Sequence, residues 1–266
     1  MKFELSMENF GICLFTLIPV RSQATDKSEM VSQLLFGETY KVLDNKSKWL
    51  LIQGQGDGYE GWIDSNQHQA LTEENLETYA SDNQLFLNKL TTIIHTKNDG
   101  IRLLSFGSII RESLFEFFPD LIRSISKEDF VTLPSTFDAD KMTAAAIKLA
   151  GTTYLWGGRS VFGMDCSGFT QLCAKAAGYQ LFRDASQQAG QGKIIDFLEE
   201  AQTGDLAFFD NDESQIVHVG IILSPGKIIH ASGCVHIDTL DHHGIFSNQQ
   251  NKYTHKLRLI RTLRYS

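Results

Sequence analysis

The sequence predicts an α+β fold in the C-terminal half of the chain, preceded by a small β-barrel and a second small β-domain. Short β-type runs separated by turn-forming clusters fill the chain up to about residue 135. An Ala-rich helical pattern then covers residues 134–151, and β-type runs return after residue 203. Helices followed by an antiparallel sheet are typical of the α+β class. We therefore expect three domains, over residues 1–70, 71–135 and 136–266.

The bulk composition describes a chain that can bury a substantial core. Its 266 residues are 42% hydrophobic and carry a formal net charge of -8. Because the balance is acidic and no run of Lys and Arg occurs, we expect neither nucleic acid nor a membrane as partner. The sequence indicates no required protein partner, no cofactor and no bound metal.

The cysteines and the N-terminal segment favour a cytoplasmic location. The four cysteines are scattered without a Cys-x-x-Cys pair, which indicates neither a disulfide framework nor a thiolate zinc site. The segment "GICLFTLIPV" (11–20) has about the length of a signal-peptide core, but Glu4 and Glu8 precede it. We interpret this segment as a buried strand, and a periplasmic location is the alternative.

Two β-rich regions precede the helical pattern. In the first, the runs "TYKVLD", "KWLLIQ" and "YEGWID" are separated by the turn-forming clusters "DNKS" and "GQGDG", as in a small barrel. In the second, "TTIIHT" and "GSIIRE" are predicted strands around the turn "KNDG", and "KEDFVTLPS" is a predicted barrel edge. This second region is therefore predicted to be another small β-domain.

Two helices begin the C-terminal domain. The first has Asp138 or Asp140 as N-cap and Gly151 just after its end. The second follows Cys166 and ends before Gly178, and its apolar residues recur at helical spacing. The strands predicted after it are "TGDLAFFD", "VHVGIIL", "KIIHAS", "CVHIDTL" and "KLRLIRTLRY".

Cys166, in "MDCSGFT", is the candidate nucleophile. A cysteine at a helix N-terminus lies at the positive end of the helix dipole, which lowers the thiol pKa. The glycines of "GGRSVFGMDCSG" would let the backbone approach a substrate closely. Full activation also needs a histidine base within hydrogen-bond reach.

Two of the eight histidines lie in predicted buried strands, namely His218 in "HVGIIL" and His230 in "IIHAS". The other candidates, in polar or turn-like surroundings, are expected to be solvated: His68, His95, His242, His243 and His255. Taken singly, either buried histidine could be merely structural. Together with Cys166 they form a possible catalytic triad of nucleophile, base and orienting group.

The hairpin between these strands tests whether the two histidines belong together. With Pro225 and Gly226 alone in the loop, His218 and His230 point to opposite faces of the sheet. With a three-residue Ser-Pro-Gly loop, Leu223 pairs with Lys227 and the two histidines share a face. The proposed chemistry therefore predicts the longer loop, with Gly226 in a left-handed conformation.

The series "YLWGGRSVFGMDCSG", "TGDLAFFD", "HVGIIL" and "IIHASG" resembles, in this order, the NlpC/p60 family of papain-like cysteine peptidases, which cleave peptides of the bacterial cell wall. The likeness covers roughly residues 137–266. It implies a papain-like domain with helices packed on an antiparallel sheet. In that family the cysteine is the nucleophile, the first histidine the base and the second the orienting residue, which carries over to Cys166, His218 and His230.

The front of the chain sharpens the resemblance. "SEMVSQLLFGE" and "DGYEGWI" resemble the first SH3-like barrel of γ-D-glutamyl-L-diamino acid endopeptidases, which carry two such barrels. The likeness implies that Glu38 and Tyr59 limit cleavage to peptides with a free N-terminal L-alanine. A carboxylate facing an ammonium suits such a gate, because a desolvated cation needs a paired anion. Without the resemblance, a solvated Glu and a Tyr packed on the barrel edge would be expected.

The same resemblance implies further substrate contacts around the nucleophile and in "FRDAS". Arg183 would pair with the α-carboxylate of D-glutamate. An internal ion pair in a polar loop is the alternative for this segment. The implied contacts are Trp156, Asp165, Ser167, Arg183, Asp184 and Ser186.

The resemblance implies a cysteine endopeptidase that hydrolyses the γ-D-glutamyl–diamino acid bond of murein peptides, in the recycling or turnover of cell-wall peptides. One alternative is a non-catalytic module that binds murein peptides, although no triad residue is missing. Another is an amidase or acyltransferase on the same fold. A zinc site is disfavoured because its candidate ligands lack the paired loop spacing of structural sites, and these ligands are Cys166, Cys234, His218, His230 and His236.

Overall fold

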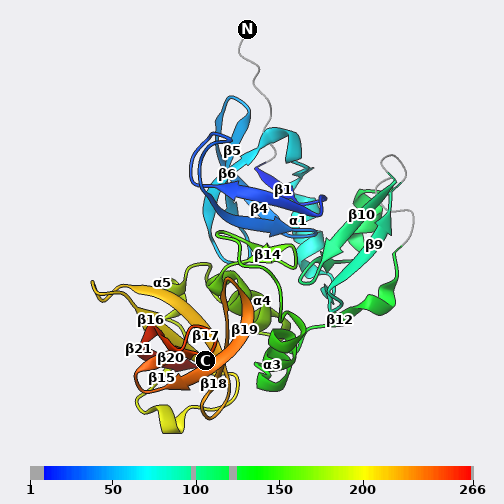
Figure 1. Cartoon of the computed structure of the whole chain (residues 1–266). Helices are drawn as coiled ribbons and strands as arrows, with labels where there is room; N and C mark the ends of the chain where they lie inside the picture. Colours follow the sequence, from blue (N-terminus) through cyan, green and yellow to red (C-terminus); the bar gives the residue numbers. More distant parts are fainter. Residues whose placement is uncertain (1–8, 97–99, 120–124, 265–266) are drawn as a thin grey trace. The chain divides into compact units, whose positions relative to one another are not determined.

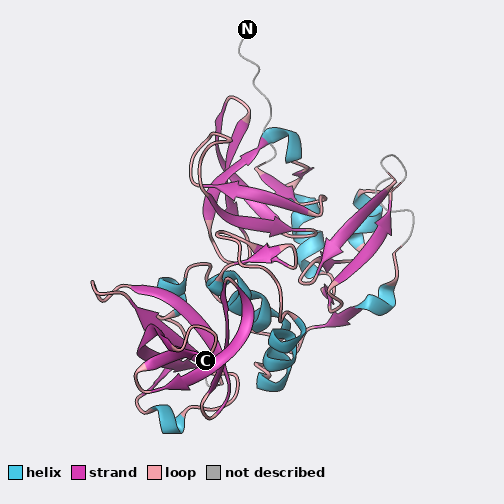
Figure 2. Cartoon of the chain, in the orientation of Figure 1, coloured by secondary structure: helices cyan, strands magenta, loops and turns pink. Residues whose placement is uncertain are grey.

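The chain divides into two compact units, Met1–Thr132 and Leu133–Ser266, in a computed structural model that describes residues 9–96, 100–119 and 125–264 (Figure 1). Both units combine helices with antiparallel strands, and strands predominate (Figure 2). Within the described ranges, none of the helices has the length and apolar character that a bilayer-spanning segment requires.

A seven-stranded antiparallel sheet opens the first unit, in the order β3-β2-β6-β5-β4-β1-β7. Ile18, Ile52 and Ile63 are fully or almost fully buried in its core. The segment 11–20, predicted as one buried strand, forms parts of two strands. The strands are β1 (Phe10–Ile12), β2 (Leu17–Arg21), β3 (Met30–Leu35), β4 (Thr39–Lys46), β5 (Trp49–Gly54), β6 (Glu60–Asp64) and β7 (Ala70–Leu71), with the short helix η1 (Ser65–Gln67) before β7.

The remainder of the first unit is more helical than the sequence predicted. Strand β9 (Thr91–His95) pairs with β10 (Ile101–Ser105), whereas the predicted partner "GSIIRE" contributes only β11 (Ile109–Ile110), which pairs with β8 (Leu85–Leu87). Residues 97–99 of the predicted "KNDG" turn lie outside the described ranges. The other elements are α1 (Glu73–Ser81), α2 (Ser113–Phe117), η2 (Lys127–Asp129) and β12 (Phe130–Thr132), which also pairs with β8.

One apolar core joins the two parts of this unit. Ile12 and Phe36, from the first sheet, share a cluster with Ile94, Leu104 and Ile110, from the later strands. Residues after position 70 therefore bury much of their apolar surface together with the first sheet. A division into separate domains at residue 70 and a second SH3-like barrel stay predictions.

The helices of the second unit begin and end where the sequence placed them. In α3 (Ala139–Lys148) the Asp138 side chain accepts hydrogen bonds from the N–H groups of Asp140 and Lys141, at 3.0 and 3.1 Å. Helix α4 (Cys166–Ala176) ends shortly before Gly178, whose φ of +82° is the left-handed conformation that glycine tolerates. A short helix, α5 (Ala185–Gln188), follows.

The strands of the second unit close into an antiparallel barrel, where the sequence predicted a sheet. The order is β15-β21-β16-β17-β18-β19-β20, and β21 also pairs with β20. A bulge in the β16–β21 ladder and another in the β20–β21 ladder accompany the closure. The strands are β15 (Lys193–Ile195), β16 (Leu206–Asp210), β17 (Ile216–Ser224), β18 (Lys227–Ser232), β19 (Cys234–Asp241), β20 (Gly244–Ser247) and β21 (Lys252–Thr262), with η3 (Leu198–Glu200) after β15. The hairpin β13 (Arg159–Ser160) and β14 (Gly163–Met164) precedes α4.

The hairpin of β17 and β18 has the predicted register along its length but not the predicted loop. Gly220 lies opposite His230, which places His218 and His230 on one face. At the turn, however, Ser224 pairs with Lys227, so the loop has two residues rather than three. A bulge between Ile222 and Ser224 supplies the missing shift of one residue. Gly226 has the expected left-handed φ, +76°.

Gly220 leaves the space that the histidine pair needs. A Cβ at this position would lie 2.9 Å from the His230 Cβ and 2.8 Å from the Ile228 Cδ1. We expect Gly220→Ala to lower the free energy of unfolding by about 1–3 kcal/mol, the usual cost of overpacking. Denaturant titration measures this loss. Gly190→Ala is the control, since its nearest atom would be 3.3 Å away, and an equal loss in both variants would contradict the argument.

Candidate active site

Cys166 is the first residue of α4, and the residue before it caps the helix. The Asp165 Oδ1 accepts a hydrogen bond from the Gly168 N–H at 2.7 Å, and its Oδ2 accepts one from the Gly157 N–H at 2.9 Å. The carboxylate thereby satisfies backbone donors on both sides of Cys166. This arrangement holds the thiol at the helix start, where free N–H groups point outward.

The glycines around Cys166 allow close packing within the protein. A Cβ at Gly168 would lie 2.3 Å from the Gly158 carbonyl oxygen, and one at Gly158 would lie 2.4 Å from the Gly163 carbonyl oxygen. The close approach that the sequence suggested for a substrate is therefore made by the β13–β14 hairpin and α4. These glycines position Cys166 by letting two backbone segments touch.

The Cys166 thiol is protonated in the free protein, contrary to the expectation from the helix dipole. Burial, and after it the charge of Asp165, raise its pKa to about 12. Hydrogen bonds from the backbone of Val219 and Ser167 and the charge of Arg183 act in the opposite direction. The Val219 contact also places the thiol beside the residue that follows His218. Burial likewise raises the pKa of Tyr154 to about 12, with the charge of Cys166 as the second cause.

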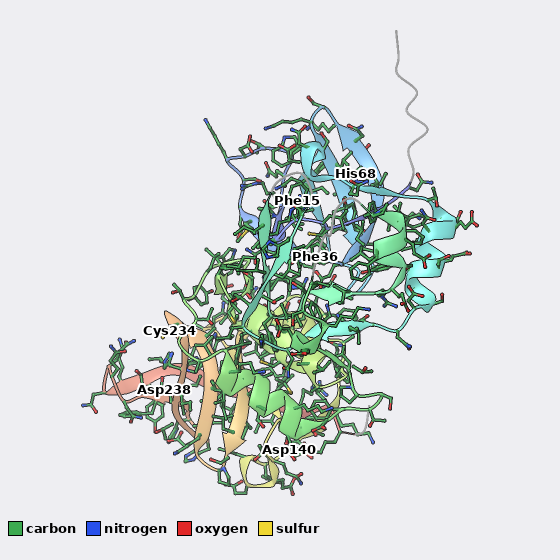
Figure 3. All side chains as sticks on the ribbon, turned by 90° about the vertical axis from the view of Figure 1, so that its right-hand side faces the viewer. Phe15, Phe36, His68, Asp140, Cys234 and Asp238 are labelled. Carbon is green, nitrogen blue, oxygen red and sulfur yellow. The ribbon has the colours of Figure 1, made fainter. Side chains whose placement is uncertain are left out.

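His218, His230 and Asp238 form a buried chain across three neighbouring strands. His218 Nε2 lies 2.9 Å from His230 Nδ1, and His230 Nε2 lies 3.4 Å from Asp238 Oδ2. All three side chains are at least nine-tenths buried. Asp238 lies on β19, the strand that also carries Cys234 (Figure 3). Sequence analysis did not select Asp238, because only the β18–β19 register brings it to His230.

Asp238 fixes which nitrogen of each ring carries the proton. A carboxylate accepts hydrogen bonds, so His230 Nε2–H donates to it and His230 Nδ1 is left as an acceptor. His218 Nε2–H then donates to His230 Nδ1, which leaves a lone pair on His218 Nδ1. Burial holds the pKa of His218 well below its usual value, so this ring is neutral. A neutral imidazole with a free Nδ1 is the form that a general base requires.

Two further histidines border this chain. The His255 ring stacks on His218, with 4.1 Å between centroids and 22° between planes. The expectation that His255 is solvated is therefore wrong, because β21 carries it to the end of the barrel where His218 lies. His236 is directly opposite His230 in the β18–β19 ladder. The expectation for His68 was also too simple, since its Nδ1 lies 3.0 Å from the Tyr40 hydroxyl.

Arg183, predicted to bind a substrate carboxylate, pairs with Asp165 in this structure. Its Nη1 and Nη2 lie 3.0 and 2.6 Å from the two Asp165 oxygens, and Nη1 also donates to the Ser167 hydroxyl at 2.9 Å. Only 1% of the Arg183 side chain is exposed. Arg183 thus forms an ion pair within the protein, but with Asp165 before α4 rather than inside the "RDAS" loop, as the alternative had it. Contacts of Asp165, Ser167 and Arg183 with a substrate stay predictions.

Gln188, which sequence analysis missed, ties the Arg183 loop to α4. Its Nε2 donates to the carbonyl oxygens of Ser167 and Phe182, at 3.0 and 2.8 Å, and its Oε1 accepts from the Thr170 hydroxyl at 2.7 Å. Gln188 is fully buried. No periodicity signal marks a buried amide in a helix of four residues, so the sequence could not single it out.

Three other predicted contacts lie on the surface or near it. Trp156 is 61% exposed in the loop before β13. Asp184 precedes α5, and its backbone N–H donates to the Gln187 side chain at 3.2 Å. Ser186 is exposed in α5. These positions leave the predicted substrate contacts untested.

The predicted gate residues lie at one end of the first sheet. Glu38 is in the turn between β3 and β4, and its Oε2 accepts the Leu35 N–H at 2.9 Å. Tyr59 is in the loop between β5 and β6. Because Gln55 donates to the Thr39 carbonyl and Gly54 donates to the Tyr59 carbonyl, these two loops meet at the same end of the strands. Their proposed role toward a substrate stays a prediction.

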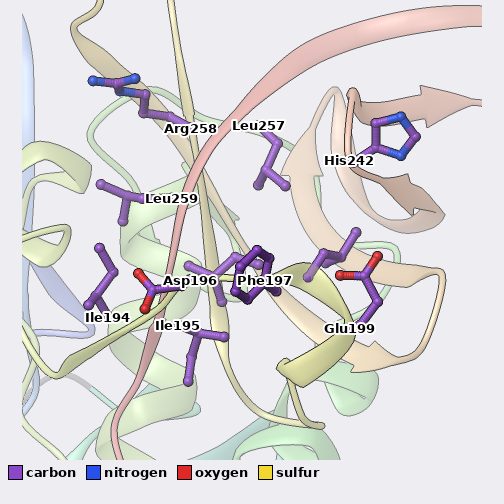
Figure 4. A pocket seen from close by; sticks show the side chains of 11 residues that line it. Ile194, Ile195, Asp196, Phe197, Glu199, His242, Leu257, Arg258 and Leu259 are labelled. Atoms are coloured by element: carbon purple, nitrogen blue, oxygen red, sulfur yellow. The ribbon is translucent and has the colours of Figure 1, made fainter.

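The second unit also has a pocket that is lined by His242 but by none of Cys166, His218 and His230 (Figure 4). It is about 460 Å³ in volume and lies along β15, η3 and the middle of β21. Another, of about 450 Å³, is lined partly by His255. The second pocket therefore adjoins the histidine cluster, whereas the first is unrelated to it.

Comparison with protein families adds to this geometry. Residues 151–258 match the NlpC/P60 family, and this range contains Cys166, His218, His230 and Asp238. The chain contains an NlpC/P60 domain. Residues 20–67 match the bacterial dipeptidyl-peptidase Sh3 domain, so the first sheet belongs to an SH3-like domain that precedes the NlpC/P60 domain.

The chain is also similar over most of its length to named proteins and to a solved structure. A protein of Bacillus subtilis named gamma-D-glutamyl-L-lysine dipeptidyl-peptidase is 29% identical over 217 residues, covering 75% of this chain and 71% of the relative. A Bacillus cereus protein of the same name is 29% identical over 232 residues, covering 78% and 68%. A crystal structure of an NlpC/P60 family protein from Bacillus cereus matches 96% of this chain and 99% of its own, with a TM-score of 0.77 and 19% identity. This last likeness concerns the fold alone.

The buried Arg183–Asp165 pair generates a stability prediction for the NlpC/P60 domain. We expect Arg183→Met to lower the free energy of unfolding by about 3–5 kcal/mol, because Asp165 would be left as a buried charge without its partner. Denaturant titration checks this loss. Lys48→Met, which removes an exposed ion pair with Asp26, is the control and should cost less than about 1 kcal/mol. A similar small loss for Arg183→Met would contradict the argument.

Proposed function

We propose that this protein is a cysteine endopeptidase that hydrolyses the γ-D-glutamyl–diamino acid bond of small murein peptides with a free N-terminal L-alanine. The proposal depends above all on the 2.9 Å contact between His218 Nε2 and His230 Nδ1, beside the helix start that carries Cys166. The names of the two Bacillus relatives support the choice of bond. A role in recycling or turnover of cell-wall peptides follows from that substrate class.

The first step starts from a neutral thiol and a neutral imidazole. The Cys166 sulfur attacks the γ-carbonyl carbon while its proton moves to His218 Nδ1, and the carbonyl oxygen becomes an oxyanion. The backbone N–H of Cys166, at the start of α4, is a donor for that oxyanion. Burial disfavours the charged thiolate form of Cys166. We therefore expect little free thiolate before substrate binds, and proton transfer to accompany the attack.

The second step releases the amine and then the acid. The imidazolium of His218 donates its proton to the departing amine of the diamino acid, which leaves a γ-glutamyl thioester on Cys166. Water then gives a proton to His218 and attacks the thioester carbonyl carbon. Collapse of this intermediate expels the sulfur, which regains the proton from His218, and frees the dipeptide acid.

The SH3-like domain would supply the selectivity for a free amine. Glu38 and Tyr59 lie at the same end of the strands, so a carboxylate and a phenol are available there together. An ammonium taken out of water needs a paired anion, and an acetylated amine would leave that carboxylate unpaired. We also propose that residues 71–135 are a divergent second SH3-like module and that the NlpC/P60 helices pack in the papain-like manner.

Mass spectrometry of peptide cleavage tests the proposed function. We expect the full-length protein to release L-Ala-γ-D-Glu from L-Ala-γ-D-Glu-meso-diaminopimelate or from the L-lysine peptide. Cys166→Ala should reduce the rate by roughly 10⁴-fold or more, because the nucleophile is lost. An N-acetylated copy of each peptide should be cleaved more slowly than the free peptide. Glu38→Gln should reduce this difference in cleavage rate.

Each result bears on a different part of the proposal. Cleavage that survives Cys166→Ala would exclude the thiol mechanism. Equal cleavage of the free and acetylated peptides would exclude the gate and leave the mechanism intact. Binding of the peptide without any cleavage would instead support the non-catalytic alternative.

Asp238 generates a separate kinetic prediction as a positioning residue. In Asp238→Ala the His230 Nε2–H loses its acceptor, so the tautomer chain to His218 is no longer specified. We expect kcat to fall roughly ten- to a hundredfold, as for other groups that orient a reactive histidine, with KM nearly unchanged. Asp238→Asn, which keeps an oxygen acceptor, should recover part of kcat. A defect confined to KM would contradict the positioning role.

A further inference from the structure

His230, His236 and Asp238 bring three metal-binding atoms together at the edge of the histidine cluster. Asp238 Oδ2 lies 3.4 Å from His230 Nε2 and 3.0 Å from His236 Nε2. All three atoms lie within 4.8 Å of one another. The β18–β19 ladder produces this arrangement, because His236 lies opposite His230 and Asp238 follows two residues later on the same face.

A backbone contact of His236 directs its second ring nitrogen at Asp238. His236 Nδ1 lies 2.8 Å from the Cys234 carbonyl oxygen, which only accepts, so the ring proton is on Nδ1. In the neutral ring, Nε2 therefore directs a lone pair at the Asp238 carboxylate only 3.0 Å away. Two acceptors at that distance repel each other unless a proton or a metal ion lies between them.

The geometry suits a four-coordinate transition metal. Zinc binds histidine nitrogen and carboxylate oxygen at about 2.0–2.2 Å, which separates tetrahedral donors by roughly 3.4 Å. The distances of 3.4 and 3.0 Å to Asp238 Oδ2 are close to that value. The His236 side chain is 32% exposed, whereas Asp238 and His230 are almost completely buried, so the ion would enter past His236. Water would complete the coordination.

We propose that His230, His236 and Asp238 form a zinc site that switches off the catalytic base. This inhibitory consequence rests on the proposed peptidase function, whereas the binding itself does not. The set differs from the zinc alternative considered from the sequence, since it uses neither cysteine and adds Asp238. All three ligands lie on the β18–β19 hairpin, unlike the paired loop ligands of a structural zinc site.

The switch would act through the tautomers of the two catalytic histidines. A metal on His230 Nε2 requires the proton of that neutral ring to be on Nδ1, from which it donates to His218 Nε2. His218 must then carry its own proton on Nδ1, so that nitrogen has no lone pair for the Cys166 proton. Both rings remain neutral with one proton each, but His218 is then in the tautomer that cannot accept the thiol proton at Nδ1. Zinc would inhibit without touching the thiol.

The binding test uses a variant that lacks both cysteines near the site, Cys166→Ala/Cys234→Ser. We expect this full-length variant to bind one zinc ion by equilibrium dialysis and to give the visible absorption of four-coordinate Co²⁺. Adding His236→Gln should weaken binding at least tenfold. Adding His242→Gln, which changes an exposed histidine outside the cluster, should leave binding unchanged. Absence of binding, or equal binding in all variants, would overturn the site.

The inhibition test uses peptide cleavage by the protein with its cysteines intact. Each variant is compared with its own rate in a metal chelator. Zinc should inhibit the unmodified protein and the His242→Gln variant at similar concentrations, and His236→Gln should require at least tenfold more. Equal inhibition of His236→Gln would show that zinc acts at the thiol and would overturn the switch. If no variant cleaves peptide, the proposed function fails, while the dialysis result still decides the zinc site.

Discussion

The hydrogen bond between His218 and His230 is the contact on which the arrangement of the NlpC/P60 domain depends. It joins two neighbouring strands at 2.9 Å and lies in an almost fully buried environment. A buried polar contact of this kind is costly if either partner moves, because both rings would lose their hydrogen bonds. The bulge after Ile222 sets the β17–β18 register that places both histidines on one face. The absence of a side chain at Gly220 leaves room for His230 in that register. The turn and the strand together therefore place the two imidazoles.

Barrel closure surrounds that bond with further polar groups. Strand β21 pairs with both β16 and β20, which carries His255 onto the face of His218. The next hairpin adds Asp238 and His236 on the other side. The result is a row of imidazole rings ended by one carboxylate, in which each proton position depends on the next. In the proposed zinc site, this row would link a cation at Asp238 to His218.

Two electrostatic effects compete at the start of α4, and burial is the stronger. The helix terminus and nearby donors favour the thiolate, but desolvation and the Asp165 carboxylate raise the pKa of Cys166. Arg183 neutralises that carboxylate through a two-pronged pair, and Gln188 anchors the loop that carries Arg183. Cys166 is thus held as a thiol by a buried network of hydrogen bonds. In the mechanism proposed above, it is activated only when substrate binds.

The local sequence determined the helix that begins at Cys166, the two strands that carry His218 and His230, and the β-rich character of the first unit. These features depend on caps, glycines and side-chain periodicity, which act over a few residues. The predicted pairing of "TTIIHT" with "GSIIRE" was wrong. Ile110, in the second of these segments, pairs with β8 instead of β9 and packs in the shared core of the first unit. Local patterns do not specify such choices.

Only the tertiary structure decided that Asp238, His236 and His255 join the pair, that the sheet closes, and that Arg183 is paired internally. Each depends on contacts between segments whose sequences carry no mutual signal, such as the β18–β19 register and the double pairing of β21. The protonation of Cys166 also belongs here, since desolvation is a property of everything packed around an atom. Residue types indicated which chemical groups are present, and packing determined the partners and protonation states of those groups.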